Sequence, residues 1–259
     1  MMFGLIAVAL ALALFAIMVG AIELGRTVGR RQLRSGGEGL AKGTGAAEGA
    51  IFALLGLLIA FTFSGAAQRF EARRLLVTDE ANAIGTAWQR LDLLPAAAQP
   101  EMRDLFRRYL DARLAAYRHA TQREVALEDL AVSNALQARI WAQALAAVNA
   151  AGAAPQAGVL LLPALNEMFD ITTTRTAATA NHPPFAVFVL LFALAAASAV
   201  LVGYATSENA SRGRLLNVGF AAIIALAVYV ILDLEYPRLG IIRVDAADQV
   251  LIELRKGMD

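Results

Sequence analysis

The sequence of 259 residues contains no cysteine and two histidines, His119 and His182. The absence of thiols excludes disulfide bonds, thiolate catalysis and cysteine-ligated zinc or iron–sulfur centres. His119 ends an arginine-rich segment, where it suits the C-terminal end of a helix. His182 precedes a Pro-Pro pair, where we expect an interface role. We therefore expect no metal site and no cofactor.

Catalytic and nucleotide-binding motifs are also missing from the sequence. It has no HExxH or GxSxG motif, and "GEGLAKGTGAAEG" lacks the GK[ST] ending of a phosphate-binding loop. No polar residues are spaced as an acid–base or nucleophile pair. The formal net charge of +1 provides no general field for nucleic acid. We expect no catalytic residue, no enzyme activity and no nucleic-acid partner.

Long apolar runs are abundant, since 58% of the residues are hydrophobic and the mean hydropathy is +0.56. A membrane-spanning helix needs about 20 mostly apolar residues. The runs of this length are Phe3–Ile22, Gly49–Ala67, Phe185–Ala205 and Leu215–Leu232. The first lacks a basic leader and is interpreted as a retained helix. The sequence predicts an all-α integral membrane protein with four transmembrane helices in a lipid bilayer.

Ionisable residues are almost absent from the middle of these runs. Ion-coupled transporters usually need such a group at the centre of the membrane, so that class is disfavoured. A pore lined by apolar side chains stays open, because a hydrophobic constriction gates by dewetting. Four spans are too few to enclose a pore, so a channel requires an oligomer.

A polar insert separates the second and third spans. Its first apolar positions recur at helical spacing: Phe70, Val77, Ala81, Ile84, Trp88 and Leu91. A second helix is expected to begin near Gln99 or Pro100. The insert is predicted to consist of three or four antiparallel helices packed as a bundle. The predicted domains are 1–67 with a flexible Gly/Arg-rich linker at 23–48, the insert at 68–184, the last two spans at 185–233, and a tail at 234–259.

Charged and polar residues gather where the second span meets the insert. This juxtamembrane cluster comprises Arg69, Glu71, Arg73, Arg74, Glu80 and Asn82. Arginines at this depth extend to the lipid headgroups. Glu80 and Asn82 are predicted to lock the span to the bundle and only secondarily to line a path for ions. Arg73 is able to pair with Glu80 inside one subunit or between subunits. Asp233 and Glu235, which close the fourth span, are expected to anchor it in the headgroup layer or to line an ion vestibule.

Two stretches resemble a known family. They are "LLGLLIAFTFSGAAQRFEARRLLVTDEANAIGTAW" (Leu54–Trp88) and "LDLEYPRLGIIRV" (Leu232–Val244). They are similar to the bestrophin-like domain of bacterial membrane proteins, a domain-of-unknown-function group. That group shows an "EANAIG" helix after the second span and a D-x-x-x-P-x-x-G ending, matched here by Asp233, Pro237 and Gly240.

"RFEARR" extends the resemblance to bestrophin channels, which share the plan of two spans, a helical insert and two spans. Bestrophins are pentameric anion or cation channels whose second helix lines a narrow apolar neck. The resemblance implies a homo-oligomer, a pentamer if bestrophin-like, with small inorganic ions as partners, in the bacterial inner membrane. The implied neck residues are Leu54, Leu57 and Phe61. The chain departs from bestrophins in having one aromatic in "RFEAR" and a long linker.

A second function stays open on the same residues: a non-conducting membrane sensor or scaffold with a ligand- or partner-binding insert. The membrane orientation is also open. Basic residues flank the two sides equally. The uncharged N-terminus followed by arginines favours a cytoplasmic linker, whereas the bestrophin plan implies a cytoplasmic insert.

Overall fold

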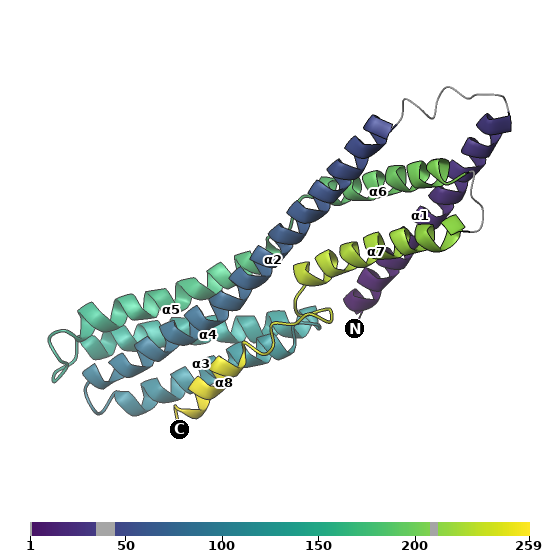
Figure 1. Ribbon diagram of the computed structural model, residues 1–259. Helices are drawn as coiled ribbons and strands as arrows, with labels where there is room; N and C mark the ends of the chain where they lie inside the picture. The colour runs from purple at the N-terminus through teal and green to yellow at the C-terminus, as the bar shows by residue number, and fades with distance from the viewer. Residues whose placement is uncertain (1, 35–44, 208–211) are drawn as a thin grey trace. The chain divides into compact units, whose positions relative to one another are not determined.

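The computed structural model describes residues 2–34, 45–207 and 212–259, and within these ranges the ordered elements are helices (Figure 1). The helices are α1 Met2–Arg34, α2 Gly45–Arg90, the short 3-10 helix η1 Leu91–Leu93, α3 Gln99–Arg118, α4 Arg123–Val148, α5 Ala157–Ala180, α6 Phe185–Ala205, α7 Arg212–Glu235 and α8 Gln249–Lys256. The chain divides into a membrane unit, residues 1–68 and 182–236, and an insert unit, residues 69–181 and 237–259.

The four predicted spans are confirmed, since four helices are long and apolar enough to cross a membrane. The third predicted span coincides with α6, whose N-cap is Pro184. The fourth is longer than predicted at both ends and runs from Arg212 to Glu235. The spans pack around a buried core that includes Leu14, Met18, Leu191, Ala195 and Val228. The protein is therefore a multi-pass, all-α membrane protein.

The predicted extent of the linker is wrong. Residues 23–34 continue α1 and residues 45–48 begin α2, while 35–44 lie outside the described residues. Two glycines of the predicted linker, Gly25 and Gly29, are packing points of α1 instead. A Cβ on Gly203 of α6 would lie 1.9 Å from the Ile22 carbonyl oxygen, and one on Gly25 would lie 2.0 Å from the Val200 oxygen. Small residues let membrane helices approach this closely, so α1 stays helical where it contacts α6.

The insert unit is the predicted helical bundle. Its core includes Val77, Ile84, Phe106, Ile140 and Leu165, contributed by α2, α3, α4 and α5. The predicted apolar seam is confirmed on α2 and at the start of η1, with Val77, Ala81, Ile84 and Leu91 buried and Phe70 and Trp88 partly buried. The second insert helix begins at Gln99, as expected.

Specific contacts fix the order of the helices around the bundle. Glu80 joins α2 to α3, His119 joins α3 to Asp129 of α4, and Gln137 joins α4 to Thr172 of α5. Two further bonds set α5 antiparallel to α2: Arg73 Nη2 donates to the Asn181 carbonyl and Arg90 Nη1 to the Leu160 carbonyl. The pairs α2–α3 and α4–α5 therefore form opposite sides of the bundle.

The C-terminal helix α8 covers the α2–α3 side. Arg255 Nε donates to Asp111 Oδ1 at 2.9 Å, and Arg107 Nε donates to the Met258 carbonyl at 2.8 Å. These two bonds show that α8 runs antiparallel to α3. A Cβ on Gly85 of α2 would make ordinary van der Waals contact with Leu254, at 3.5 Å. The tail is thus part of the insert unit.

Candidate functional site

The implied neck residues lie together on one face of α2 in the membrane unit. Leu54, Leu57 and Phe61 are spaced by about one helical turn and are 50%, 51% and 67% exposed. Leu55, on the opposite side of the helix, is 2% exposed and packs in the membrane core. The chain therefore leaves an apolar stripe of α2 uncovered, and nothing else in the described membrane unit packs over these three side chains to close it.

Glu80 is the centre of a buried polar network in the insert unit. Its Oε1 accepts a hydrogen bond from Arg113 Nε at 2.7 Å, and its Oε2 accepts one from Tyr117 Oη at 2.7 Å. Arg175 of α5 donates to Oε2 as well. The Glu80 carboxylate is 0% exposed, and a buried charge of this kind needs paired and hydrogen-bonded partners. The network joins α2, α3 and α5 within the insert unit.

Tyr117 also carries a stack of guanidinium groups. The Cζ atoms of Arg175, Arg113 and Arg238 lie 4.0, 5.0 and 5.0 Å from its ring centroid. Arg238 is neutralised separately, because its Nη1 and Nη2 donate to the two carboxylate oxygens of Asp248 at 2.7 and 2.9 Å. Such cation–π contacts are strongest where water is excluded. The Tyr117 stack therefore ties the start of the tail to the bundle.

The titration of these groups follows from their burial and neighbours. Burial, and next the Glu80 charge, raise the pKa of Tyr117 well above its ordinary value. Burial alone would lower the pKa of Arg113, but Tyr117 and Glu80 outweigh it and raise that pKa. Burial raises the pKa of Tyr109 to about 12. The network thus holds a neutral phenol hydrogen-bonded to an ion pair.

Sequence reasoning missed Arg113, Tyr117, Arg175 and Arg238. One signal for Arg113 was available: it lies four residues after Tyr109 on the apolar stripe of α3, where a charge is out of place. No comparable signal marks Arg175 or Arg238. Their roles depend on contacts across the bundle rather than on local spacing.

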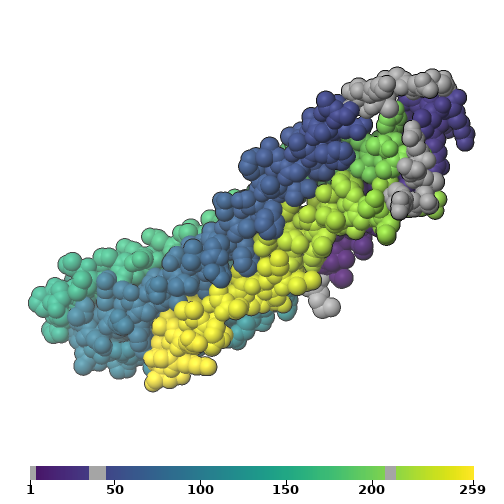
Figure 2. Space-filling model, in the orientation of Figure 1, coloured from purple at the N-terminus to yellow at the C-terminus, as the bar shows by residue number. Residues whose placement is uncertain are grey.

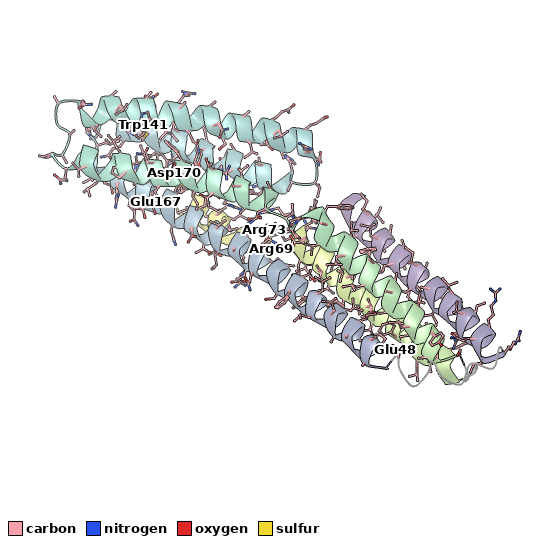
Figure 3. The ribbon with its side chains drawn as sticks, turned by 90° about the horizontal axis from the view of Figure 1, so that it is seen from above. Glu48, Arg69, Arg73, Trp141, Glu167 and Asp170 are labelled. Carbon is pink, nitrogen blue, oxygen red and sulfur yellow. The ribbon has the colours of Figure 1, made fainter. Side chains whose placement is uncertain are left out.

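The juxtamembrane arginines do not behave alike. Arg73 is 7% exposed, and its Nε and Nη2 donate to the carbonyls of Ala178 and Asn181 at 3.0 and 2.8 Å. These bonds direct the guanidinium to the carbonyls that end α5, so the prediction that Arg73 pairs with Glu80 inside one chain is wrong. Arg74 is exposed and pairs with Glu71 at 2.8 Å. Arg69 is partly buried and projects from α2 beside Arg73 (Figure 3).

Asn82 lies exposed on α2. Over the part of the chain that the structure describes, its side chain makes no hydrogen bond to the bundle. Glu80 therefore contacts the neighbouring helices of the insert and Asn82 does not, because Asn82 lies on the outer face of the helix.

The C-terminal motif spans the boundary between the two units. Asp233 belongs to the membrane unit and Pro237 and Gly240 to the insert unit. Asp233 and Glu235 are each 1% exposed, so both carboxylates are covered by protein atoms. Glu235 faces His182 (Oε2 to Nδ1, 3.3 Å), which stacks on Tyr236. In the insert unit the Pro237 carbonyl accepts a bond from Val244 at 3.0 Å and starts the turn toward α8.

Metal-ligating side chains do not converge in residues 2–34, 45–207 and 212–259: there is no group of three or more His, Asp or Glu able to hold an ion. The buried carboxylate of Glu80 is engaged by Arg113 and Arg175, so it is a structural anion. The features suited to function are the uncovered apolar stripe of α2 and the exposed surface of the bundle.

Comparison with protein families gives a match over most of the chain. The family described as "Bestrophin-like domain" matches residues 12–248. Both quoted motifs fall inside the matched range: Leu54–Trp88 lies in α2, and Leu232–Val244 begins in the last turn of α7. No match was found among curated proteins.

Solved structures share the fold. A bacterial bestrophin homolog from Klebsiella pneumoniae, in one mutant form, matches with a TM-score of 0.71 at 16% identity, covering 97% of this chain and 98% of that chain. A second mutant form gives 0.70 at 16% identity, with the same coverage. A structure of the homolog solved by zinc phasing gives 0.68 at 16% identity, covering 95% and 97%. At this identity the likeness shows the fold.

Proposed function

Because the chain belongs to the bestrophin-like domain family, we propose that it forms a homo-oligomeric ion channel in the bacterial inner membrane. In this proposal α2 of each copy faces a common axis. Leu54, Leu57 and Phe61 form an apolar neck there, and small inorganic ions pass through it. A pentamer is the assembly that the bestrophin resemblance implies.

The observation that carries the proposal is the uncovered stripe on α2. Three large apolar side chains sit on one face at helical spacing, each at least half exposed in the single chain. Copies arranged around an axis bring this stripe into rings, one ring per side chain. Apolar rings in a narrow pore control permeation by dewetting. The absence of ionisable groups on this face is consistent with such a gate.

Reconstitution of the purified protein tests the proposal. Native mass spectrometry in detergent should give an oligomer, and planar bilayers containing it should show ionic currents that empty bilayers lack. A folded oligomer that stays electrically silent over a range of salts and voltages would contradict the channel. A monomer would contradict both the neck and the assembly.

A non-conducting sensor or scaffold is the second candidate, supported by the insert being a compact unit with its own core. A reporter fused near Pro155, in the connection between α4 and α5, distinguishes the two. A periplasmic reporter signal favours a sensor whose insert binds ligands outside the cytoplasm. A cytoplasmic signal agrees with the bestrophin plan. In either case we propose a non-enzymatic role.

A further inference from the structure

An apolar stripe runs along the outer face of α4 in the insert unit. It consists of Leu127, Ala131, Ala135, Ala138, Ala142 and Leu145, in steps of four, four, three, four and three residues. All six are exposed, Leu127 at 55% and Leu145 at 37%. The outer face of a bundle helix in water is normally polar. Apolar residues at this period form the seam by which one helix packs on another.

The rest of the chain already occupies the other faces of α4. Gln143 bonds to Glu101 on the α3 side, and Trp141 packs against Phe169 on the α5 side, with ring centroids 6.5 Å apart. Trp141, on the α5 side, remains partly exposed. No described residue of the insert unit covers the stripe, which leaves it available to a partner.

Charge on the two sides of the bundle indicates which partner. On the α4–α5 side, Asp170 of α5 is exposed and forms no ion pair within the described ranges (Figure 3). On the α2–α3 side, α8 lies at the surface (Figure 2) and presents Lys256, likewise exposed and unpaired among the residues described. Val250 of α8, 40% exposed, is an apolar side chain on the same side. One copy of the chain thus carries two complementary surfaces: the α4 stripe with Asp170 on one side of the bundle, and α8 with Lys256 and Val250 on the other.

Hydrogen bonds show that these halves lie at equal heights along the bundle. Arg255, next to Lys256, bonds to Asp111 of α3. Near Asp111 on α3, Tyr109 accepts a bond from Gln137 of α4, which also bonds to Thr172 of α5. Lys256 is therefore level with the part of α5 that carries Asp170.

Val250 can be placed in the same way. It precedes Arg255 on α8, which runs antiparallel to α3, so it is level with the part of α3 between Asp111 and His119. His119 bonds to Asp129 of α4 at 2.7 Å. Val250 is therefore level with the start of the stripe, near Ala131.

We propose that the α4 stripe of one copy packs against α8 of the next copy, with Asp170 facing Lys256 and Ala131 near Val250. The proposal rests on the ring assembly of the proposed channel. In a ring whose rotation axis is parallel to the bundle, each residue lies at the same height in every copy. The residues matched in height therefore meet across the contact. The contact is head-to-tail, since it joins two different surfaces of the chain. Every copy has both surfaces occupied only when the copies form a ring.

Engineered cysteines test this contact, because the natural chain has none. In the full-length protein, Asp170→Cys with Lys256→Cys places the thiols on opposite sides of one bundle. A disulfide can then form only between copies. Mild oxidation should give a ladder of multimers on non-reducing gels, which collapses on reduction. Each single variant should stay monomeric on the same gel.

A second pair, Ala131→Cys with Val250→Cys, should give the same ladder without removing the charges. The matched control is Arg139→Cys with Lys256→Cys. Arg139 is exposed on α4 near the height of Asp170. It lies one helical turn before Gln143, which bonds to Glu101 of α3, so it is on the α3 side and this pair should give no ladder.

The outcomes separate the contact from the channel. Ladders from both designed pairs, absent from the control, support the contact. An oligomer by native mass spectrometry that gives no ladder overturns the contact and leaves the channel standing. Equal ladders from the control overturn it too. A monomer by mass overturns both proposals.

Discussion

Glu80 and Arg113 form a wholly buried ion pair, with 2.7 Å between Oε1 and Nε and side-chain exposures of 0% and 2%. The two residues are 33 positions apart and join α2 to α3. Arg175 adds a second guanidinium from α5. The carboxylate thus organises three of the four main helices of the insert, and its removal leaves two cations without their anion.

Replacing Glu80 by Ala should destabilise the insert by about 3–5 kcal/mol, because Arg113 and Arg175 become buried, unpaired charges. Asp79→Ala is the matched control. Asp79 is the neighbouring carboxylate, exposed and without an ion pair among the described residues, and its loss should change stability by less than about 0.5 kcal/mol.

Intrinsic fluorescence measures this effect selectively, because both tryptophans of the chain, Trp88 and Trp141, lie in the insert unit. Thermal unfolding in detergent should show a clear drop in the midpoint for Glu80→Ala and none for Asp79→Ala. Equal midpoints for the two variants would show that the network does not hold the bundle together.

Arg73 and Arg74 should differ in the same assay. Arg73→Ala removes two charged hydrogen bonds to the carbonyls of Ala178 and Asn181. Each hydrogen bond to a charged group contributes about 1.5–3 kcal/mol. Arg74→Ala removes only an exposed ion pair with Glu71, worth about 0–1 kcal/mol. Arginines that only reach for headgroups would instead give two similar, small effects.

Gly203→Ala should destabilise the membrane unit, because the added Cβ would lie 1.9 Å from the Ile22 carbonyl oxygen. Overpacking of this kind costs about 1–3 kcal/mol or more. Gly219→Ala on α7 is the control, since its Cβ would meet nothing within 4 Å. Thermostability measured by size-exclusion chromatography after heating should fall for Gly203→Ala only. If both variants keep an intact peak after heating, the close approach of α1 and α6 is refuted.

Alkaline pH should weaken the insert through Tyr109. Burial raises the pKa of its phenol to about 12 in the folded state, against about 10 when unfolded. The folded state therefore keeps the proton longer. Its stabilising contribution is complete below pH of about 10 and is lost as pH rises toward 12.

Fluorescence-detected unfolding between these pH values checks this expectation. The stability of the natural chain should decline across the window. Tyr109→Phe should decline less steeply, starting from a lower value because its bond with Gln137 is lost. Parallel slopes would indicate that Tyr109 titrates normally.

The spans and the bundle could be predicted because their signals are local. Apolar runs of membrane length mark the spans, and the period from Phe70 to Leu91 marks the buried seam of α2. The extent of the Gly-rich linker was mispredicted because the contacts that keep part of it helical are not local. Gly25 and Gly29 look like breakers, but they pack against α6, and that contact is invisible before α6 is placed.

The Glu80 network shows more clearly which contacts cannot be predicted from the sequence. Glu80 was recognisable as a polar residue that headgroup contact does not explain. Its partners Arg113 and Arg175 lie 33 and 95 positions away, and no spacing rule connects them. Asn82 carried the same signal and lies exposed, since a helical projection does not tell which polar edge faces a neighbour.

Single-channel recording of neck variants tests the central claim most directly. Phe61→Ala and Leu57→Ala widen the proposed apolar neck and lower its barrier to wetting, so both should raise unitary conductance in planar bilayers. Leu226→Ala, which shortens an exposed apolar side chain on α7 (62% exposed), is the matched control and should leave conductance unchanged. A unitary conductance that is unchanged by the α2 substitutions would contradict a pore lined by α2. The absence of any current from a folded oligomer would contradict it as well.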